Sequence, residues 1–98
     1  MANNLLWLQQ WFFDQCDGDW EHMQQIKIGT LDNPGWTIRI DLLETSLENE
    51  IFNRIRIERT ETDWLICRVE DHTFMGSGGV FNLDEIIDIF KNWAVSVK

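Results

Sequence analysis

Two runs of alternating apolar residues, separated by a Pro-Gly pair, constrain the fold of this chain more than any other feature. Ile26 and Ile28 precede Pro34 and Gly35, and the second run places apolar residues at every other position: Trp36, Ile38, Ile40 and Leu42. A period of two is typical of a β-strand with one buried face. Pro followed by Gly is typical of the central positions of a type II turn, in which the glycine takes positive φ. Residues 24–42 are therefore predicted to form a β-hairpin whose apolar face needs a cover.

A second hairpin is predicted downstream of the first. Residues 51–58 form its outgoing strand, residues 60–63 its turn, and the return strand over 64–70 carries apolar residues on both faces. The basic residues of these strands are expected to pair across the strands with Glu58 or Glu70 rather than to form an anion-binding patch; they are Arg54, Arg56 and Arg68.

A short fifth strand is predicted over residues 73–75, after a turn at Asp71-His72. The glycine-rich stretch 76–79 follows it. This stretch lacks the lysine of a P-loop and the glycine spacing of a dinucleotide-binding loop. We therefore expect it to act as a flexible connection or as a place of close backbone packing.

The first of two predicted amphipathic helices spans residues 4–16. Asn3 or Asn4 is its expected N-cap and Gly18 its expected end, and one apolar stripe along it contains Leu5, Leu8, Phe12 and Cys16. Further apolar residues lie outside that stripe, among them Trp7 and Trp11. A helix that is apolar around most of its circumference is buried on more than one side or offers a face to a partner.

The second helix is predicted over residues 83–95. Asn82 is its expected N-cap, and Glu85 completes a capping box three residues later. Its apolar residues recur at helical spacing and form one stripe that is expected to pack on the sheet: Leu83, Ile86, Ile87, Phe90, Trp93, Ala94 and Val97.

Together these elements predict an α+β fold in a single domain over residues 1–98. An antiparallel sheet of about five strands, built from two hairpins plus one strand, is packed by an N-terminal and a C-terminal helix. No stretch approaches the roughly 20 apolar residues of a membrane span. The N-terminus lacks the basic residue and the cleavage site of a signal peptide, so we expect a cytoplasmic protein with two reduced thiols, Cys16 and Cys67.

The acidity of the chain indicates the kind of partner that it meets. Acidic residues outnumber basic ones by 17 to 8, and the resulting net charge of −9 is concentrated in the first half. Such a surface repels nucleic acid and anionic membranes and attracts basic partners. The alternative is that the acidity serves solubility alone.

One acidic cluster resembles a metal site, because five possible ligands fall within seven residues: Cys16, Asp17, Asp19, Glu21 and His22. The spacing does not fit an EF-hand loop, and a second pair of ligands for zinc is missing. The alternatives are a turn in which Trp20 fills the core, and an exposed anionic ridge for a cationic partner. No serine lies in a G-x-S-x-G context and neither histidine is linked to a nucleophile, so catalytic residues and cofactors are not expected.

Several blocks of sequence, in order along nearly the whole chain, resemble the immunity protein 53 family. The blocks are Trp7-Leu8-Gln9-Gln10-Trp11-Phe12, Cys16-Asp17-Gly18-Asp19-Trp20-Glu21-His22, residues 26–36, Asp63-Trp64, residues 67–71, residues 76–79 and residues 82–86. Two departures are that Phe12-Phe13 stands where a Tyr is expected, and Val80 where a Pro is common. The resemblance implies a bacterial immunity protein of a polymorphic toxin system, which binds the C-terminal toxic domain of a secreted toxin in the cytosol and blocks it.

The resemblance carries over no contact residues, so we predict the contacts from charge. A basic toxin domain, such as a nuclease, is expected to meet the acidic first half of a monomeric chain through Asp14, Asp17, Asp19, Glu21, Asp32, Glu44, Glu48 and Glu50. Tryptophan is enriched at binding hot spots, so an aromatic anchor is expected among Trp7, Trp11, Trp20 and Trp36. The alternative function is a small metal- or ligand-binding domain that uses Asp17, Asp19, Glu21 and His22.

Overall fold

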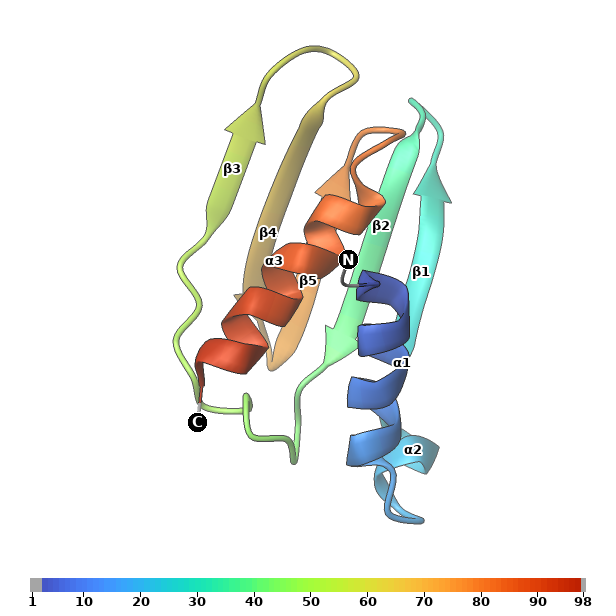
Figure 1. Ribbon diagram of the computed structural model, residues 1–98, viewed down its shortest axis with the longest axis vertical. Coiled ribbons are helices and arrows are strands. Elements are labelled where there is room, and N and C mark those ends of the chain that lie inside the picture. Colours follow the sequence, from blue (N-terminus) through green and yellow to red (C-terminus); the bar gives the residue numbers. More distant parts are fainter. Residues whose placement is uncertain (1–2, 98) are drawn as a thin grey trace.

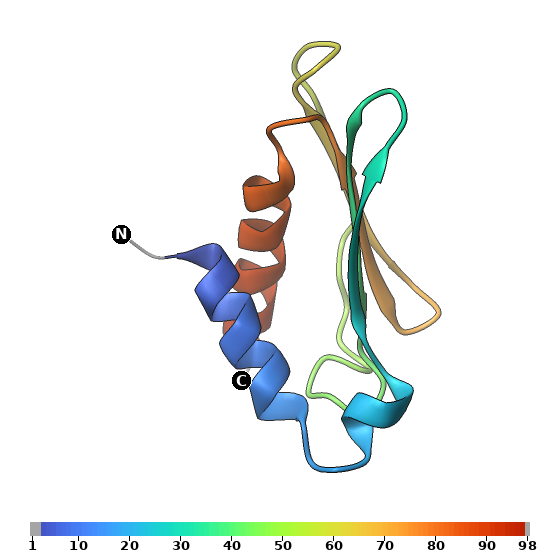
Figure 2. The same cartoon turned by 90° about the vertical axis from the view of Figure 1, so that its right-hand side faces the viewer.

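A computed structural model describes residues 3–97 as one antiparallel sheet with two long helices on the same face (Figures 1 and 2). The α+β prediction is thereby confirmed. In chain order the elements are α1 (Asn4–Gln15), α2 (Trp20–Met23), β1 (Ile26–Leu31), β2 (Gly35–Asp41), β3 (Ile55–Glu58), β4 (Trp64–Glu70), β5 (Thr73–Gly78) and α3 (Leu83–Ser96). Within the described residues, no helix has the length and apolar character required to cross a membrane.

The two predicted hairpins are joined through β5, which is the central strand of the order β1-β2-β5-β4-β3. The prediction that β5 ends at residue 75 is wrong, because the strand continues to Gly78, with Gly76 opposite both Ile38 and Cys67. A Cβ on Gly76 would collide with the Ile86 side chain. The glycines thus allow α3 to approach the sheet closely, which confirms close packing and overturns the flexible connection.

The first hairpin has a different turn from the one predicted. Leu31 pairs with Gly35, so the turn contains only residues 32–34. Gly18 is the glycine with positive φ among the described residues, and Gly35 lies in extended backbone, so the type II assignment is wrong. A glycine is needed at position 35 for another reason: a Cβ there would collide with the carbonyl oxygen of Gly78.

The second hairpin is shorter than predicted at its start. Its first strand begins at Ile55, and Ile51, which was expected in that strand, is 83% exposed. Phe52 instead turns inward and lies edge-on to Phe74, with ring centroids 5.5 Å apart. At the other end of β4, Asp71 and His72 both take positive φ, which fits the tight turn predicted there.

The core lies between α3 and the sheet. Ile38, Phe74, Ile86 and Phe90 are fully buried. Burying one such side chain contributes roughly 1.5–3 kcal/mol. Cys67 is also fully buried on this face, and burial raises the pKa of its thiol to about 12. The apolar stripe predicted for the last helix is confirmed as its core face.

Helix α1 buries only part of the apolar stripe that its sequence shows. Asn3 caps it as expected, since its Oδ1 accepts a hydrogen bond from the Leu6 N–H (3.0 Å), but the helix ends at Gln15 and Gly18 lies in the loop beyond. The buried positions are Asn4, Leu8 and Trp11, and the Trp11 ring lies edge-on to Phe90. Leu5, the first residue of that stripe, is 50% exposed.

Candidate functional site

The structure brings seven of the predicted acidic contacts to one end of the molecule, which we call the acidic end. They come from the C-terminal part of α1, the α1–α2 loop, α2 and the connection after β2, and they are Asp14, Asp17, Asp19, Glu21, Glu44, Glu48 and Glu50. Both chain segments lie at the lower end of the ribbon in Figure 1. The sequence contains no Lys or Arg in residues 3–26 or 40–53, so these segments supply no cation of their own.

Trp20 joins the two segments of the acidic end. Its indole Nε1 donates a hydrogen bond to the Leu43 carbonyl oxygen (2.8 Å), and its ring lies edge-on to Trp11 and Phe12. Trp20 is only 2% exposed. The interpretation that it fills the core is therefore confirmed, and its burial corrects its assignment as a surface anchor.

Two of the acidic side chains are bound to the loop that carries them. Asp17 Oδ1 accepts hydrogen bonds from the N–H groups of Trp20 and Asp19, both at 2.9 Å, and these bonds lower the pKa of Asp17. The pKa of Glu21 is lowered by its own N–H and by those of Asp17 and Gly18. Both carboxylates therefore stay ionised and hold the loop, whereas Asp14 and Asp19 are exposed at its surface.

The same bonds bear on the alternative metal site. Asp17 and Glu21 direct their oxygens to backbone N–H groups of the loop. Among residues 3–97, no group of three or more His, Cys, Asp or Glu side chains is arranged to hold a metal ion. The arrangement thus gives no support to a metal- or ligand-binding role for Asp17, Asp19, Glu21 and His22.

Two predicted contacts lie far from the acidic end. Asp32 is in the β1–β2 turn, which Figure 1 places at the opposite end of the sheet. Trp36 is half-buried at the same end and donates its Nε1 hydrogen to the Val80 carbonyl oxygen (3.0 Å). The structure therefore does not bring these two residues together with the other acidic positions.

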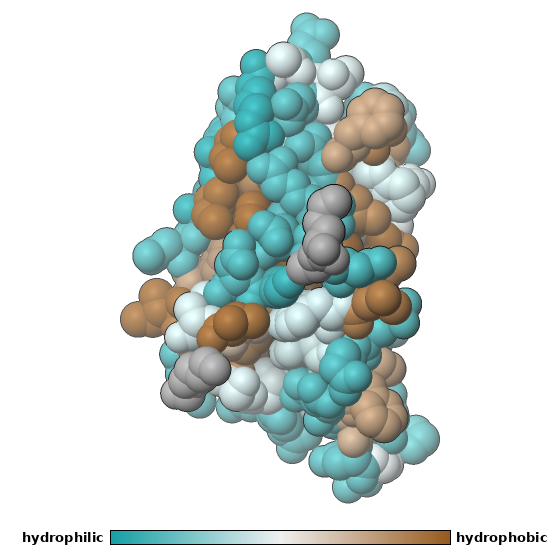
Figure 3. Space-filling view, viewed as in Figure 1, coloured by the Kyte–Doolittle hydropathy of each residue, from teal (hydrophilic) through white to brown (hydrophobic). Residues whose placement is uncertain are grey.

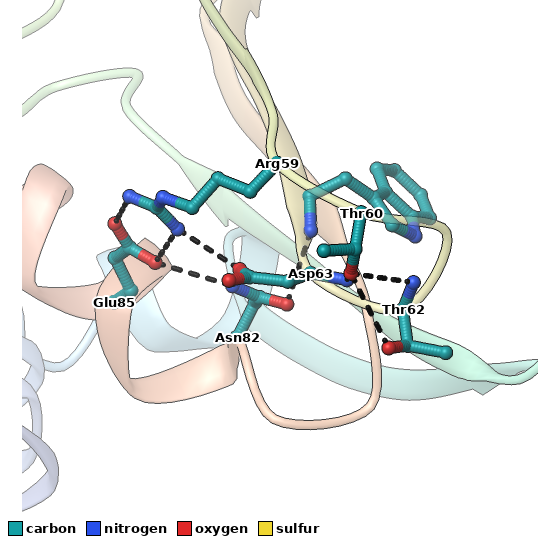
Figure 4. A network of polar contacts seen from close by, with 7 residues as sticks. Arg59, Thr60, Thr62, Asp63, Asn82 and Glu85 are labelled. Carbon is teal, nitrogen blue, oxygen red and sulfur yellow. Dashed lines mark hydrogen bonds and ion pairs between the residues drawn. The ribbon is translucent and has the colours of Figure 1, made fainter.

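At this opposite end, carboxylates form a network with cationic and amide groups (Figure 4). Arg59 binds Asp63 at 2.9 Å and Glu85 at 2.8 Å. Asn82, which is 5% exposed, donates to Asp63 and Glu85 and accepts from the Trp64 N–H. The predicted capping box is wrong in this respect, because the Asn82 side chain bonds across to the second hairpin instead of capping α3.

The network changes the pKa of its members. The hydrogen bond from Asn82, followed by that from Arg59, lowers the pKa of Asp63. The bond from Arg59 is the main cause of the lowered pKa of Glu85, and the two carboxylates raise the pKa of Arg59. Each charge here is matched by a partner, so the network ties the second hairpin to α3.

The sheet face without helices carries cationic residues. Lys27 and Arg39 lie opposite each other on β1 and β2, and Met75 separates Arg39 from Arg68 in the same row. Arg68 binds Glu70 at 3.2 Å and Arg56 binds Glu58 at 3.3 Å. These two arginines pair with the glutamates that were predicted, but each pair lies along one strand, so the prediction of pairing across strands is wrong.

A groove between α1 and β1 is the feature that sequence reasoning missed, and we call it the α1–β1 groove. It has a volume of about 370 Å³ and is lined by apolar and polar side chains: Leu5, Leu8, Gln9, Phe12, Glu21, Gln24, Gln25, Ile26 and Ile28. Leu5 and Ile28 are 50% and 41% exposed. Figure 3 shows hydrophobic side chains along this right-hand side of the molecule. The surplus of apolar residues around the first helix was the signal for it.

Comparison with known proteins identifies the family of the chain. The sequence model described as Immunity protein 53 matches residues 5–95, which is nearly the whole chain. No curated protein and no solved structure is significantly similar. The match agrees with the blocks of sequence described above, and the chain belongs to the Immunity protein 53 family.

Proposed function

We propose that this immunity protein binds the toxic domain of its cognate toxin directly, without catalysis, and that its acidic end meets a basic surface of that domain. The observation that supports this placement is the absence of Lys and Arg from both segments that form the acidic end. An unneutralised surface of one sign speeds association with a partner of opposite charge. Binding would take place in the cytosol of the producing cell and protect that cell. The chain would thus act as the immunity protein of a polymorphic toxin system.

A nuclease is the toxin class that we propose, because nucleases carry basic surfaces for phosphate. The domain encoded at the C-terminal end of the adjacent toxin gene is the probe. Expressed in a bacterium, it should stop growth, and co-expression of this chain should restore growth and allow the two proteins to be purified together. A purified toxin domain that is not bound by the folded chain would overturn the proposal.

A matched pair of variants tests the placement at the acidic end. Asp14→Lys with Asp19→Lys reverses charge there, and Asp32→Lys with Glu61→Lys makes the same change in net charge at the opposite end; all four side chains are exposed. We expect the first pair to slow association at low salt by roughly ten-fold or more and the second pair to change it far less. Asp17 and Glu21 are avoided because they hold the loop. Equal slowing by both pairs would contradict the placement.

A further inference from the structure

Among residues 3–97, no strand pairs with the outer edge of β1. β1 is the first strand in the sheet order, and Figure 1 shows no element beyond it. Gln25 O accepts a hydrogen bond from Asp41 N (3.1 Å), which fixes the alternation of the ladder between β1 and β2. The N–H and C=O groups of Ile26, Ile28 and Thr30 therefore point away from β2, as a template for another strand.

The α1–β1 groove runs beside this free edge. Leu5, Leu8 and Phe12 line it from α1, and Ile26 and Ile28 line it from β1. Side chains of a strand point alternately to its two faces, so a strand added to β1 would direct every second side chain toward the groove. Main-chain hydrogen bonds combined with pockets for alternate side chains are the usual basis of recognition by strand addition.

We propose that the toxin domain adds a β-strand to the free edge of β1 and places apolar side chains in the α1–β1 groove. This inference rests on the proposed function and names the contact through which it acts. The exposed apolar residues of the groove and the unpaired backbone groups of β1 then serve one partner.

Charge specifies the chemistry of the added strand. Glu21 both lines the groove and belongs to the acidic end. Its carboxylate stays ionised while it accepts the N–H bonds of Asp17 and Gly18, so a basic residue is expected beside it on the toxin strand. On the other face of the sheet, Lys27 would meet an acidic or neutral polar residue of that strand. A second copy of this chain is the poorer occupant, because both copies carry a net charge of −9 and repel each other.

Two adjacent leucines provide a matched test of the groove. Leu5 lines it and is 50% exposed, whereas Leu6 is 60% exposed and lies outside it. We expect Leu5→Gln to weaken binding of the toxin domain by roughly ten-fold or more, and Leu6→Gln to change it by less than about two-fold. Equal effects of the two substitutions would contradict occupation of the groove.

Proline provides a matched test of the edge, because it removes an N–H that only a partner strand would use. Thr30→Pro does so on β1. Arg56→Pro does so on β3, whose outer edge also has no partner strand in the part of the chain that the structure describes. We expect about a ten-fold loss of affinity from Thr30→Pro and little change from Arg56→Pro, with circular dichroism confirming that both variants fold.

Amide hydrogen exchange gives a direct readout in the native complex. In the free chain, Lys27 and Gly29 N–H groups bond to β2, whereas those of Ile26, Ile28 and Thr30 face solvent. Toxin binding should slow exchange of these three amides. A complex that forms without slowing them overturns strand addition and leaves the proposed function intact, whereas failure to form any complex overturns both. Slowing in the free chain at high concentration would assign the edge to a second copy.

Discussion

The two ends of the sheet use the same kind of side chain in opposite ways. At the end opposite the acidic end, Asp63 and Glu85 bind Arg59 and share the buried amide of Asn82, so each charge has a partner. At the acidic end, the sequence segments contain no Lys or Arg, and carboxylates such as Asp17 accept hydrogen bonds from backbone N–H groups. The difference teaches that acidic residues stabilise this fold in two ways, by binding a cation and an amide at one end and by accepting backbone N–H bonds at the other. At the acidic end the exposed carboxylates Asp14 and Asp19 are the ones that we propose for a partner.

The largest expected effect comes from removing the buried side chain of Trp20, which joins the two segments of the acidic end. Trp20→Ala removes a side chain that is 2% exposed and contacts Trp11, Phe12 and the Leu43 carbonyl oxygen. We expect a loss of about 3–5 kcal/mol in the free energy of unfolding, measured by urea titration. Trp20→Phe retains a ring and loses the hydrogen bond, so it should cost less. A loss below about 1 kcal/mol for the alanine variant would contradict the structural role of Trp20 in joining the two segments.

The next largest effect is expected from breaking the polar network around Asn82, at the end opposite the acidic end. Asn82→Ala leaves the Trp64 N–H without its acceptor and removes the donor to Asp63 and Glu85. An unsatisfied buried polar group costs about 1–3 kcal/mol, and we expect a loss of that size in urea unfolding. Asn53→Ala, at an exposed position in the connection before β3, is the control and should lie within about 0.5 kcal/mol of the parent. Equal stability of Asn82→Ala and the control would show that the network is not structural.

A smaller expected effect is a pH dependence of the free energy of unfolding. It distinguishes carboxylates that have a cationic or amide partner from those that do not. The pKa values of Asp63 and Glu85 are lowered in the fold, so their stabilisation is present above their ordinary values of 3.8 and 4.5 and is lost as pH falls through the lowered ones. Glu85→Gln should therefore be less stable than the parent at pH 7, and the difference should shrink below pH 4.5. Urea midpoints across this range test it. A difference that grows on acidification would reverse the assignment.

The smallest expected effect is at an exposed residue of the acidic end. Asp19→Asn removes one of several like charges from a surface side chain and keeps its size. We expect the free energy of unfolding to change by less than about 0.5 kcal/mol, whereas association with a basic toxin domain slows. The decisive comparison is between urea unfolding and stopped-flow binding of the same variant. A substantial loss of stability would show that Asp19 belongs to the structural carboxylates instead.

Sequence periodicity predicted the elements better than their arrangement. Alternation identified both hairpins, and the stripe through Ile86 and Phe90 identified the core face of α3. Both patterns arise because apolar residues on a buried face recur with the period of the strand or helix. Periodicity says nothing of strand order, so the central place of β5 was not predictable. Gly76 and Gly78 looked like a loop, yet they are strand residues whose missing side chains make room for α3.

The candidate site was predictable only in part, for two physical reasons. Residues 14–21 and 44–50 carry visible charge, but the sequence does not show that they share one end, where the hydrogen bond from Trp20 to the Leu43 carbonyl oxygen joins them in the structure. On α1, Leu5 and Trp11 both fit apolar stripes, and sequence alone does not say which side meets α3. The groove lies on the stripe that remains open, so it became visible only in three dimensions.

The buried thiol of Cys67 allows the opening of the fold to be measured by chemical labelling. A thiol reagent needs access to the thiolate, and Cys67 is fully buried with a pKa raised to about 12. In a Cys16→Ser background, the rate of labelling therefore reports how often the sheet separates from α3. A partner that binds only the folded chain should slow that labelling in proportion to its concentration over its dissociation constant, so toxin affinity becomes readable from the chemistry of one sulfur atom.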